Sequence, residues 1–133
     1  MGLSEEEIDR RVRRAAADVG LAEELLDKSP FDLSGGEKRR AAIAGVLAME
    51  PRYLILDEPA AGMNPHETED LANTIRFIRD HFDMTILLIE HDMNFVSDLC
   101  DELTVLSFGT VLSQGDTKTV LQDPEVINAY IGG

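Results

Sequence analysis

The sequence lacks several features that would place it in a special class of protein. It has no tryptophan and one cysteine in 133 residues, and only 5% of its residues are aromatic. A single cysteine excludes an internal disulfide and fits a reducing compartment, and we interpret Cys100 as a small buried apolar side chain rather than a nucleophile. No apolar run approaches the roughly 18 residues of a membrane span. With 44% hydrophobic residues, the chain is predicted to form one globular domain with its own core.

Positive charge is also scarce, which limits the partners of the protein. The chain has 12 Lys and Arg residues against 26 Asp and Glu residues, a formal net charge of −14. A surface this acidic repels phosphate backbones, so we predict no direct binding to nucleic acid. The basic residues concentrate at positions 10–14 and 38–40. We therefore expect any phosphate-binding surface in the N-terminal third of the chain.

The first 50 residues are predicted to be mainly helical, and one stretch within them is chemically distinctive. Ser4 and three glutamates start a helix that Gly20 closes, and residues 21–26 predict a second short helix. The sequence LSGGE at residues 33–37 then starts a helix predicted from about Glu37 to Met49. Its exposed glycine amides, its serine hydroxyl and the helix dipole favour a seat for a terminal phosphate, and an ordinary serine-capped helix is the alternative.

Two acidic residues follow a short apolar strand. Residues 53–56 (YLIL) are typical of a strand buried on both faces of a parallel sheet, and Asp57 and Glu58 lie at its carboxyl end, where open α/β sheets bind ligands. Asp57 suits a magnesium ion, usually through water, and Glu58 suits orienting or deprotonating an attacking water. Acids at the end of a buried strand are costly unless a cation neutralises them, and a solvated turn is the alternative.

The rest of the chain alternates strands with helices, which indicates an α/β fold. A tight loop at residues 60–65 and a long amphipathic helix precede a second apolar strand at residues 84–89. His91 lies just past this strand, so two parallel strands would bring Asp57, Glu58 and His91 to one edge of a sheet. The remaining predicted elements are a helix at 92–99, strands at 103–107 and 111–113, and short helices at 117–122 and 124–130.

Taken together, these residues resemble one family, the ATP-binding-cassette (ABC) ATPases. LSGGE matches the signature motif of that family, and LILDEP at residues 54–59 matches its Walker B strand with the catalytic glutamate. Residues 60–65 fall on the D-loop and His91 on the switch histidine. The resemblance implies a partial P-loop NTPase fold, with residues 1–50 as part of the helical (signature) subdomain and residues 51–133 as the C-terminal half of the catalytic core.

The resemblance also implies a role for each site residue, with ATP and Mg²⁺ as cofactors. Asp57 would serve the magnesium, Glu58 would polarise the hydrolytic water, and His91 would contact the terminal phosphate. The residues that would contact ATP, held by an opposite ATPase subunit, are Ser34, Gly35, Gly36 and Glu37, and Asn64 lies in the D-loop. The parent protein would be cytoplasmic, peripheral to the membrane, and would drive solute import through membrane permease subunits.

The sequence departs from the family pattern in two places. Asn64 stands where the D-loop usually has aspartate, which keeps hydrogen bonding but removes charge. No G-x-x-x-x-G-K-[ST] motif occurs and the Q-loop region is missing, so the core lacks the Walker A strand. We therefore expect this chain alone to hydrolyse ATP very slowly or not at all. The resemblance also implies that the Walker A strand would lie between the strands at 84–89 and 103–107. Without it these two strands would either close up on each other or leave edges that pair with another chain, and we predict a homo-oligomer.

Other interpretations remain open. Residues 1–50 resemble energy-coupling-factor and cobalt-type importers, whereas the sequence from Asp57 onward resembles branched-chain amino-acid importers, which suggests a chimera joined near residues 51–58. A non-enzymatic folding module, truncated or engineered, and a half-site that needs a complementary Walker A fragment are further alternatives. A lobe of a chromosome-maintenance ATPase is disfavoured by the net charge of −14 and by the absence of heptads.

Overall fold

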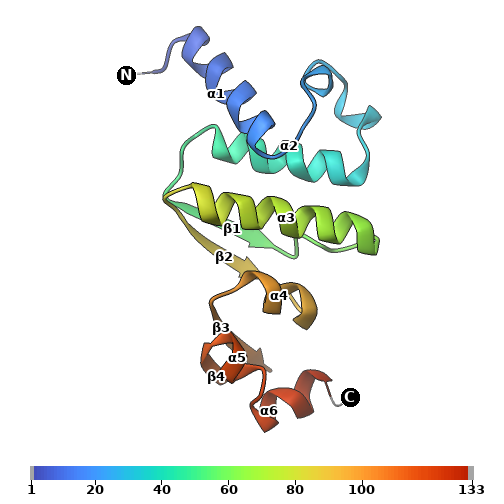
Figure 1. The fold of residues 1–133 in the computed structure, drawn as a ribbon, viewed down its shortest axis with the longest axis vertical. Coiled ribbons are helices and arrows are strands. Elements are labelled where there is room, and N and C mark those ends of the chain that lie inside the picture. Colours follow the sequence, from blue (N-terminus) through green and yellow to red (C-terminus); the bar gives the residue numbers. More distant parts are fainter. Residues whose placement is uncertain (1, 132–133) are drawn as a thin grey trace. The chain divides into compact units, whose positions relative to one another are not determined.

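A computed structural model describes residues 2–131 and divides the chain into two compact units, Met1–Ile89 and Glu90–Gly133. Figure 1 shows the helices and strands along the chain. Among the residues described, no helix is long and apolar enough to cross a membrane.

The first unit begins with two helices that contact each other. Helix α1 (Glu5–Asp18) starts after the capping residue Ser4, as the sequence predicts. Helix α2 (Gly35–Leu47) follows two short 3-10 turns, Glu23–Leu25 and Pro30–Asp32. The first of these turns takes the place of the predicted second helix. The apolar side chains buried on the two helices are Ala15, Ala16, Ile43, Ala44 and Leu47.

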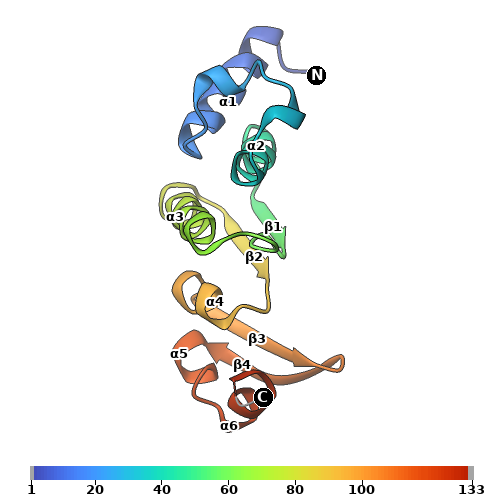
Figure 2. The ribbon, with the colours of Figure 1, turned by 90° about the vertical axis from the view of Figure 1, so that its right-hand side faces the viewer.

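The rest of the first unit is a strand–helix–strand arrangement. Strands β1 (Tyr53–Asp57) and β2 (Thr85–Ile89) pair in parallel, which confirms the predicted parallel core, and α3 (Pro65–His81) connects them. Figure 2 shows α3 on one side of the two strands. Leu54 and Leu56 of β1 are 2% and 9% exposed. The buried side chains of α3 are Leu71, Ala72, Ile75 and Ile78.

The expectation that β1 is buried on both faces is wrong. Its residues alternate between exposed and buried, and Tyr53 and Ile55 are 72% and 64% exposed. On β2, Leu87 and Ile89 are 56% and 49% exposed. The physical reason is that one helix can cover only one face of a two-stranded sheet. We call the surface formed by Tyr53, Ile55, Leu87 and Ile89 the open face.

The second unit is built around an antiparallel hairpin. It starts with α4 (Met93–Leu99), followed by β3 (Glu102–Ser107) and β4 (Thr110–Asp116), which is longer than the predicted strand at 111–113. The turn between the strands has Phe108 and Gly109 at φ +47° and +77°, the left-handed pair that matches the twist of a hairpin. The unit ends with α5 (Thr117–Val120), α6 (Pro124–Val126) and a π-helical turn (Ile127–Ile131). The core of the unit contains Val105, Val120 and Val126.

The hydrogen-bonded strands form two separate two-stranded sheets, β1–β2 and β3–β4. The expected closing of the slot between the strands at 84–89 and 103–107 involves both units, and it stays a prediction. The other half of that expectation, pairing of strand edges with another chain, stays a prediction.

Candidate functional site

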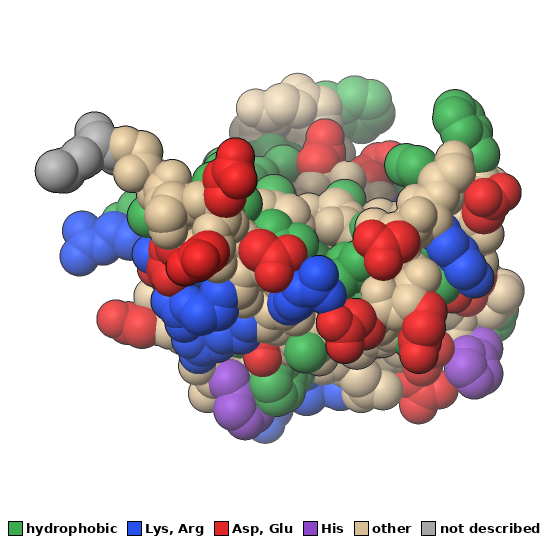
Figure 3. All heavy atoms as spheres, turned by 90° about the horizontal axis from the view of Figure 1, so that it is seen from above, with side chains coloured by type: hydrophobic (Ala, Val, Ile, Leu, Met, Phe, Trp, Pro, Cys, Tyr) green, Lys and Arg blue, Asp and Glu red, His purple; other side chains and the backbone are tan. Residues whose placement is uncertain are grey.

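The arginines of α1 do not form a free phosphate-binding surface. Arg10 and Arg11 both pair with Glu7, each at 2.7 Å, and Arg11 also reaches Glu50 at 3.0 Å. Figure 3 shows acidic side chains beside the basic ones on this side of the molecule. These pairs offset the positive charge of α1, so the predicted phosphate contacts depend on α2.

The start of α2 is a capping box built from Ser34 and Glu37. The Ser34 Oγ accepts a hydrogen bond from the Glu37 N–H at 3.2 Å, and a Glu37 carboxylate oxygen accepts one from the Ser34 N–H at 2.7 Å. The helix therefore begins at Gly35, two residues before the predicted start. The prediction of a serine-capped helix is confirmed, and the side chains of both Ser34 and Glu37 stabilise the start of α2.

The capping box does not use the backbone N–H groups of the two glycines. Gly35 and Gly36 occupy the first two helical positions, where N–H groups have no acceptor within the helix. A Cβ built on Gly35 would meet no atom within 4 Å, whereas one on Gly36 would lie 3.8 Å from an Arg40 nitrogen. The positive end of the helix dipole is at the same place. An anion in front of α2 therefore suits the geometry, and its binding stays a prediction.

The capping box makes a testable prediction about acid stability. Hydrogen bonds from Ser34, chiefly from its backbone N–H and then from its side chain, lower the pKa of the Glu37 carboxyl below the ordinary value for glutamate. A pKa lowered by folding stabilises the protein above the unfolded pKa, and this stabilisation is lost as the pH falls through the folded pKa. We expect Glu37→Gln to lose less unfolding free energy than the wild type between pH 7 and pH 3 in urea titrations. Glu24→Gln, which removes the same charge outside the capping box, is the control, and an identical pH dependence for all three proteins would contradict the prediction.

Asp57 and Glu58 lie where β1 ends, and both are exposed, as in the solvated turn that the sequence left as the alternative. The Glu58 N–H donates to the Ile89 carbonyl of β2 at 2.9 Å, and the Ala61 N–H donates to the Glu58 carbonyl at 3.1 Å. Glu58 itself has φ +44°, in the left-handed region. Such a backbone costs a non-glycine residue about 1–3 kcal/mol and is concentrated at functional sites. The turn therefore holds Glu58 in a conformation that a free chain avoids.

The loop after Glu58 is fixed at both ends. Asn64 caps α3: its Oδ1 accepts from the Glu67 N–H at 3.0 Å, and Glu67 accepts from the Asn64 N–H at 3.1 Å. The Asn64 side-chain oxygen is therefore engaged, which leaves its amide N–H groups for the predicted nucleotide contact. Arg39 of α2 donates a hydrogen bond to the Ala61 carbonyl. This contact was not predicted from the sequence. The one feature that pointed to it is the run of basic residues after LSGGE, at positions 38–40.

His91 lies two residues past β2 and is the second residue of the second unit. Its side chain is 72% exposed, and its Nδ1 is 3.9 Å from a Glu90 carboxylate oxygen. The convergence of His91 with Asp57 and Glu58 stays a prediction from the order of the strands. Among the described residues, no three His, Cys, Asp or Glu side chains form a group that could hold a metal ion. The magnesium role expected of Asp57 therefore stays a prediction from the sequence.

Known proteins match this chain over nearly its whole length. A sequence model of the ABC transporter family matches residues 2–61. The energy-coupling factor transporter ATP-binding protein EcfA2 of Clostridium perfringens is 46% identical over 128 residues, covering 96% of this chain and 45% of that protein. The structure of cbiO1 from the same organism, part of the ABC transporter complex cbiONQ, has 41% identity, a TM-score of 0.84 and coverage of 97% of this chain and 51% of that chain. The ADP conformation of MJ1267, an ATP-binding cassette of an ABC transporter, has 30% identity, a TM-score of 0.85 and coverage of 98% and 52%.

The chain is thus related to the ATPases of ABC transporters and has their α/β P-loop fold over the part that it spans. It spans about half the length of the curated relatives that it matches. Relatives of the energy-coupling-factor type align on both sides of residues 51–58 at 45–46% identity. The comparisons therefore give no support to the expected join between two importer types.

Proposed function

We propose that this chain is the second half of an ATP-binding subunit of an ABC importer, and that the whole protein couples ATP hydrolysis to solute import. One observation carries the proposal. In a fold shared with such ATPases at TM-scores of 0.84 and 0.85, a Ser-Gly-Gly helix start and a strand ending in Asp57 and Glu58 occur in one unit. Residues 1–50 would form part of the helical subdomain, and residues 51–133 the second half of the core.

Each site residue has one proposed task. Glu58 orients and deprotonates the attacking water, and the fixed turn around it supports this role because a general base must be held in place. Asp57 holds the magnesium ion, which would offset negative charge on the phosphates. His91 contacts the terminal phosphate. The residues proposed to contact the ATP of an opposite subunit are Ser34, Gly35, Gly36 and Glu37, with Asn64 in the loop beside them.

The resemblance of residues 1–50 to energy-coupling-factor and cobalt-type importers supports a vitamin or a metal ion as the solute. Amino-acid import is the second candidate, and it is supported by the resemblance of the sequence from Asp57 onward to branched-chain importers. In both cases the subunit would lie in the cytoplasm against membrane subunits. A nucleotide titration with magnesium separates this proposal from a non-enzymatic module, because the module would bind no ATP even when the other half is supplied.

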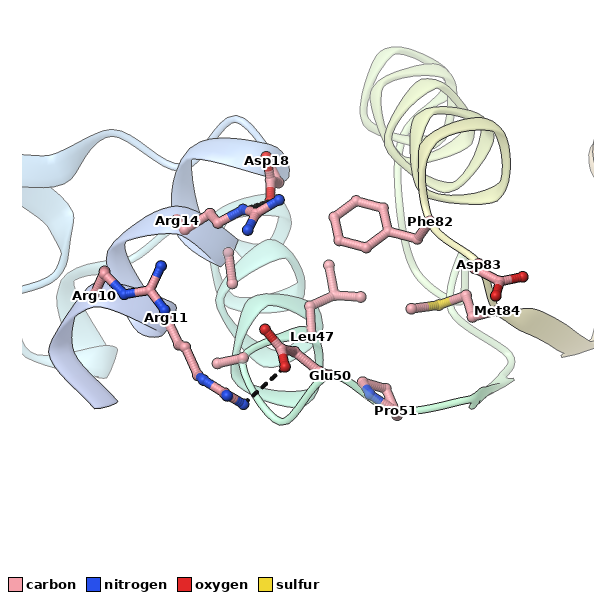
Figure 4. Close-up of a pocket in the computed structure, with 12 residues that line it drawn as sticks. Arg10, Arg11, Arg14, Asp18, Leu47, Glu50, Pro51, Phe82, Asp83 and Met84 are labelled. Carbon is pink, nitrogen blue, oxygen red and sulfur yellow. Dashed lines mark ion pairs between the residues drawn. The ribbon is translucent and has the colours of Figure 1, made fainter. Parts of the chain in front are cut away.

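A pocket in the first unit suits a helix of such a membrane subunit. It has a volume of about 250 Å³ and lies between α1, the end of α2 and the turn before β2. Figure 4 shows Leu47, Phe82 and Met84 around it, with Arg10 and Arg14 also among its lining residues. Apolar residues surrounded by charged ones are the usual composition of a docking site between proteins.

The open face of β1 and β2 is the surface proposed to receive the missing half. Parallel sheets are normally covered on both faces, and an isolated two-stranded sheet is marginal in water. Four large apolar side chains on this face, Tyr53, Ile55, Leu87 and Ile89, are 49–72% exposed. The relatives contain more than half of their length outside the matched segment. A complementary half would therefore bury an apolar surface that the chain alone exposes.

Mixing the two halves tests this proposal. The second component is the segment of the Clostridium perfringens relative that precedes its match to this chain. We expect light scattering to show a homo-oligomer for the chain alone and a one-to-one complex in the mixture, which we call the reassembled enzyme. We also expect magnesium-dependent ATP hydrolysis in the mixture. We expect the one-to-one complex because it would bury the open face, and burial of apolar surface contributes about 25 cal/mol per Å².

Ile55→Ser tests whether the open face forms the interface in this experiment. Ile55 is 64% exposed, so its replacement leaves the chain folded but places a polar group in the proposed interface. We expect at least about tenfold weaker association, since one buried isoleucine contributes about 1.5–3 kcal/mol. A mixture that stays unassociated and inactive would contradict the proposed function, and a monomeric chain alone would contradict the homo-oligomer.

A further inference from the structure

Arg39 joins two segments that carry predicted site residues. It lies in α2, whose first turn contains Gly35 and Gly36, and its guanidinium donates to the carbonyl oxygen of Ala61. Ala61 belongs to the loop between β1 and α3 and is 22 residues away in sequence. The side chain of Arg39 is half-buried. The contact therefore connects the loop after Glu58 to the helix whose first turn is the predicted phosphate-binding site.

Ala61 in turn holds the carbonyl end of Glu58. The Ala61 N–H donates to the Glu58 carbonyl at 3.1 Å, while the Glu58 N–H donates to Ile89 of β2 at 2.9 Å. The peptide groups of Glu58 are thus held from both sides, by β2 and by the turn that Arg39 contacts. This support matters because Glu58 has φ +44°, a conformation that only its surroundings maintain.

Part of the Arg39 guanidinium is buried without a hydrogen bond. Its second terminal nitrogen, Nη1, is buried and makes no hydrogen bond, and the Nε of the neighbouring Arg40 is in the same situation. A buried donor without an acceptor costs about 1–3 kcal/mol, and more for a charged group. A shorter polar side chain would avoid this cost. The cost is consistent with a role for Arg39 in holding the loop rather than in stability alone.

We propose that Arg39 is a positioning residue for Glu58, acting through the Ala61 backbone. The guanidinium fixes the turn from Glu58 to Ala61 and so directs the Glu58 carboxylate toward the position of the attacking water. This inference rests on the proposed function, because it assumes that Glu58 is the catalytic base.

Two measurements on Arg39→Ala test the proposal. The first is amide hydrogen exchange, followed by NMR in the 133-residue chain. We expect the Ala61 and Met63 amides to exchange about tenfold faster, because a hydrogen bond to a charged group contributes about 1.5–3 kcal/mol. The amide of Ile78 in α3 should keep its protection. The second is the steady-state kinetics of the reassembled enzyme, in which kcat should fall about tenfold while KM for ATP stays the same, since only the turn around Glu58 is loosened.

Two further variants complete the test. Arg39→Lys keeps a donor and should restore most of kcat, whereas Arg76→Ala, which removes an arginine bonded to Asn73 within α3, should change neither measurement. Unchanged exchange at Ala61, equally faster exchange at all amides, or an unchanged kcat would each overturn the positioning role. If the wild-type reassembled enzyme hydrolyses no ATP, the proposed function fails, and the exchange data still decide whether Arg39 holds the turn.

Discussion

Glu58→Gln should lower ATP turnover by the reassembled enzyme about 10²–10⁴-fold, the usual contribution of a general base. Glutamine has the shape of glutamate but its amide cannot take a proton from water at neutral pH. The backbone bonds of residue 58 to Ile89 and Ala61 do not involve the side chain, so the turn is retained. Phosphate release measured over a range of ATP concentrations should show the loss in kcat, and a nucleotide titration should show that ATP still binds.

Asp57→Asn is the companion variant for this experiment. Asp57 ends β1 next to Glu58, and its proposed partner is the magnesium ion rather than the water. We expect its loss to raise the magnesium concentration needed for half-maximal turnover, because a carboxylate is a stronger ligand for this cation than an amide. Turnover close to that of the wild type in Glu58→Gln would contradict the proposed role of Glu58. Clear turnover by the chain alone, abolished by Glu58→Gln, would contradict the expectation that the missing half is required.

Ile78→Ala should be among the most destabilising single changes in the first unit. Ile78 lies on α3 and is 0% exposed. Removing most of a buried isoleucine costs about 2–5 kcal/mol, the sum of lost transfer free energy and the cavity left behind. Since small domains are stable by only about 5–15 kcal/mol, a large part of the variant would be unfolded at modest urea concentrations. The midpoint of urea unfolding, followed by circular dichroism, measures the loss.

Ile55→Ala is the matched control, because it deletes the same atoms from a residue that is 64% exposed. We expect a change within about 0.5 kcal/mol, as for most surface substitutions. The chain divides into two compact units, so separate unfolding transitions are possible, and Ile78→Ala should shift only that of the first unit. Equal destabilisation by both substitutions would show that β1 is covered on both faces in solution.

Local sequence signals predicted where the elements begin. Ser4 and Ser34 each cap a helix where the sequence predicts one, and the helix predicted from residue 92 begins at Met93, directly after its cap Asp92. A cap depends on hydrogen bonds between residues two or three positions apart, so its chemistry is contained in a short stretch of sequence. The one clear displacement was the start of α2, because Gly35 and Gly36 form the first turn of a capping box instead of a loop before it.

Contacts between distant segments could not be predicted in the same way. The apolar run of β1 indicated burial on both faces, but Ile55 and Tyr53 are exposed, and within the first unit α3 lies on one side of the sheet. The bond between Arg39 and Ala61 spans 22 residues, and no pattern in the sequence indicates which of three consecutive basic residues reaches the loop. Both outcomes depend on which segments meet in space.

The sequence by itself therefore determined the family resemblance, the order of the motifs and the starts of most elements, since motifs and caps are short-range features. Only the tertiary structure decided that Glu58 takes a left-handed backbone, that the acidic pair is exposed, and that one face of β1 and β2 is uncovered. The physical reason is that burial and backbone strain are set by neighbouring segments. In this chain those neighbours cover one face of the sheet and leave the large apolar side chains of the open face exposed.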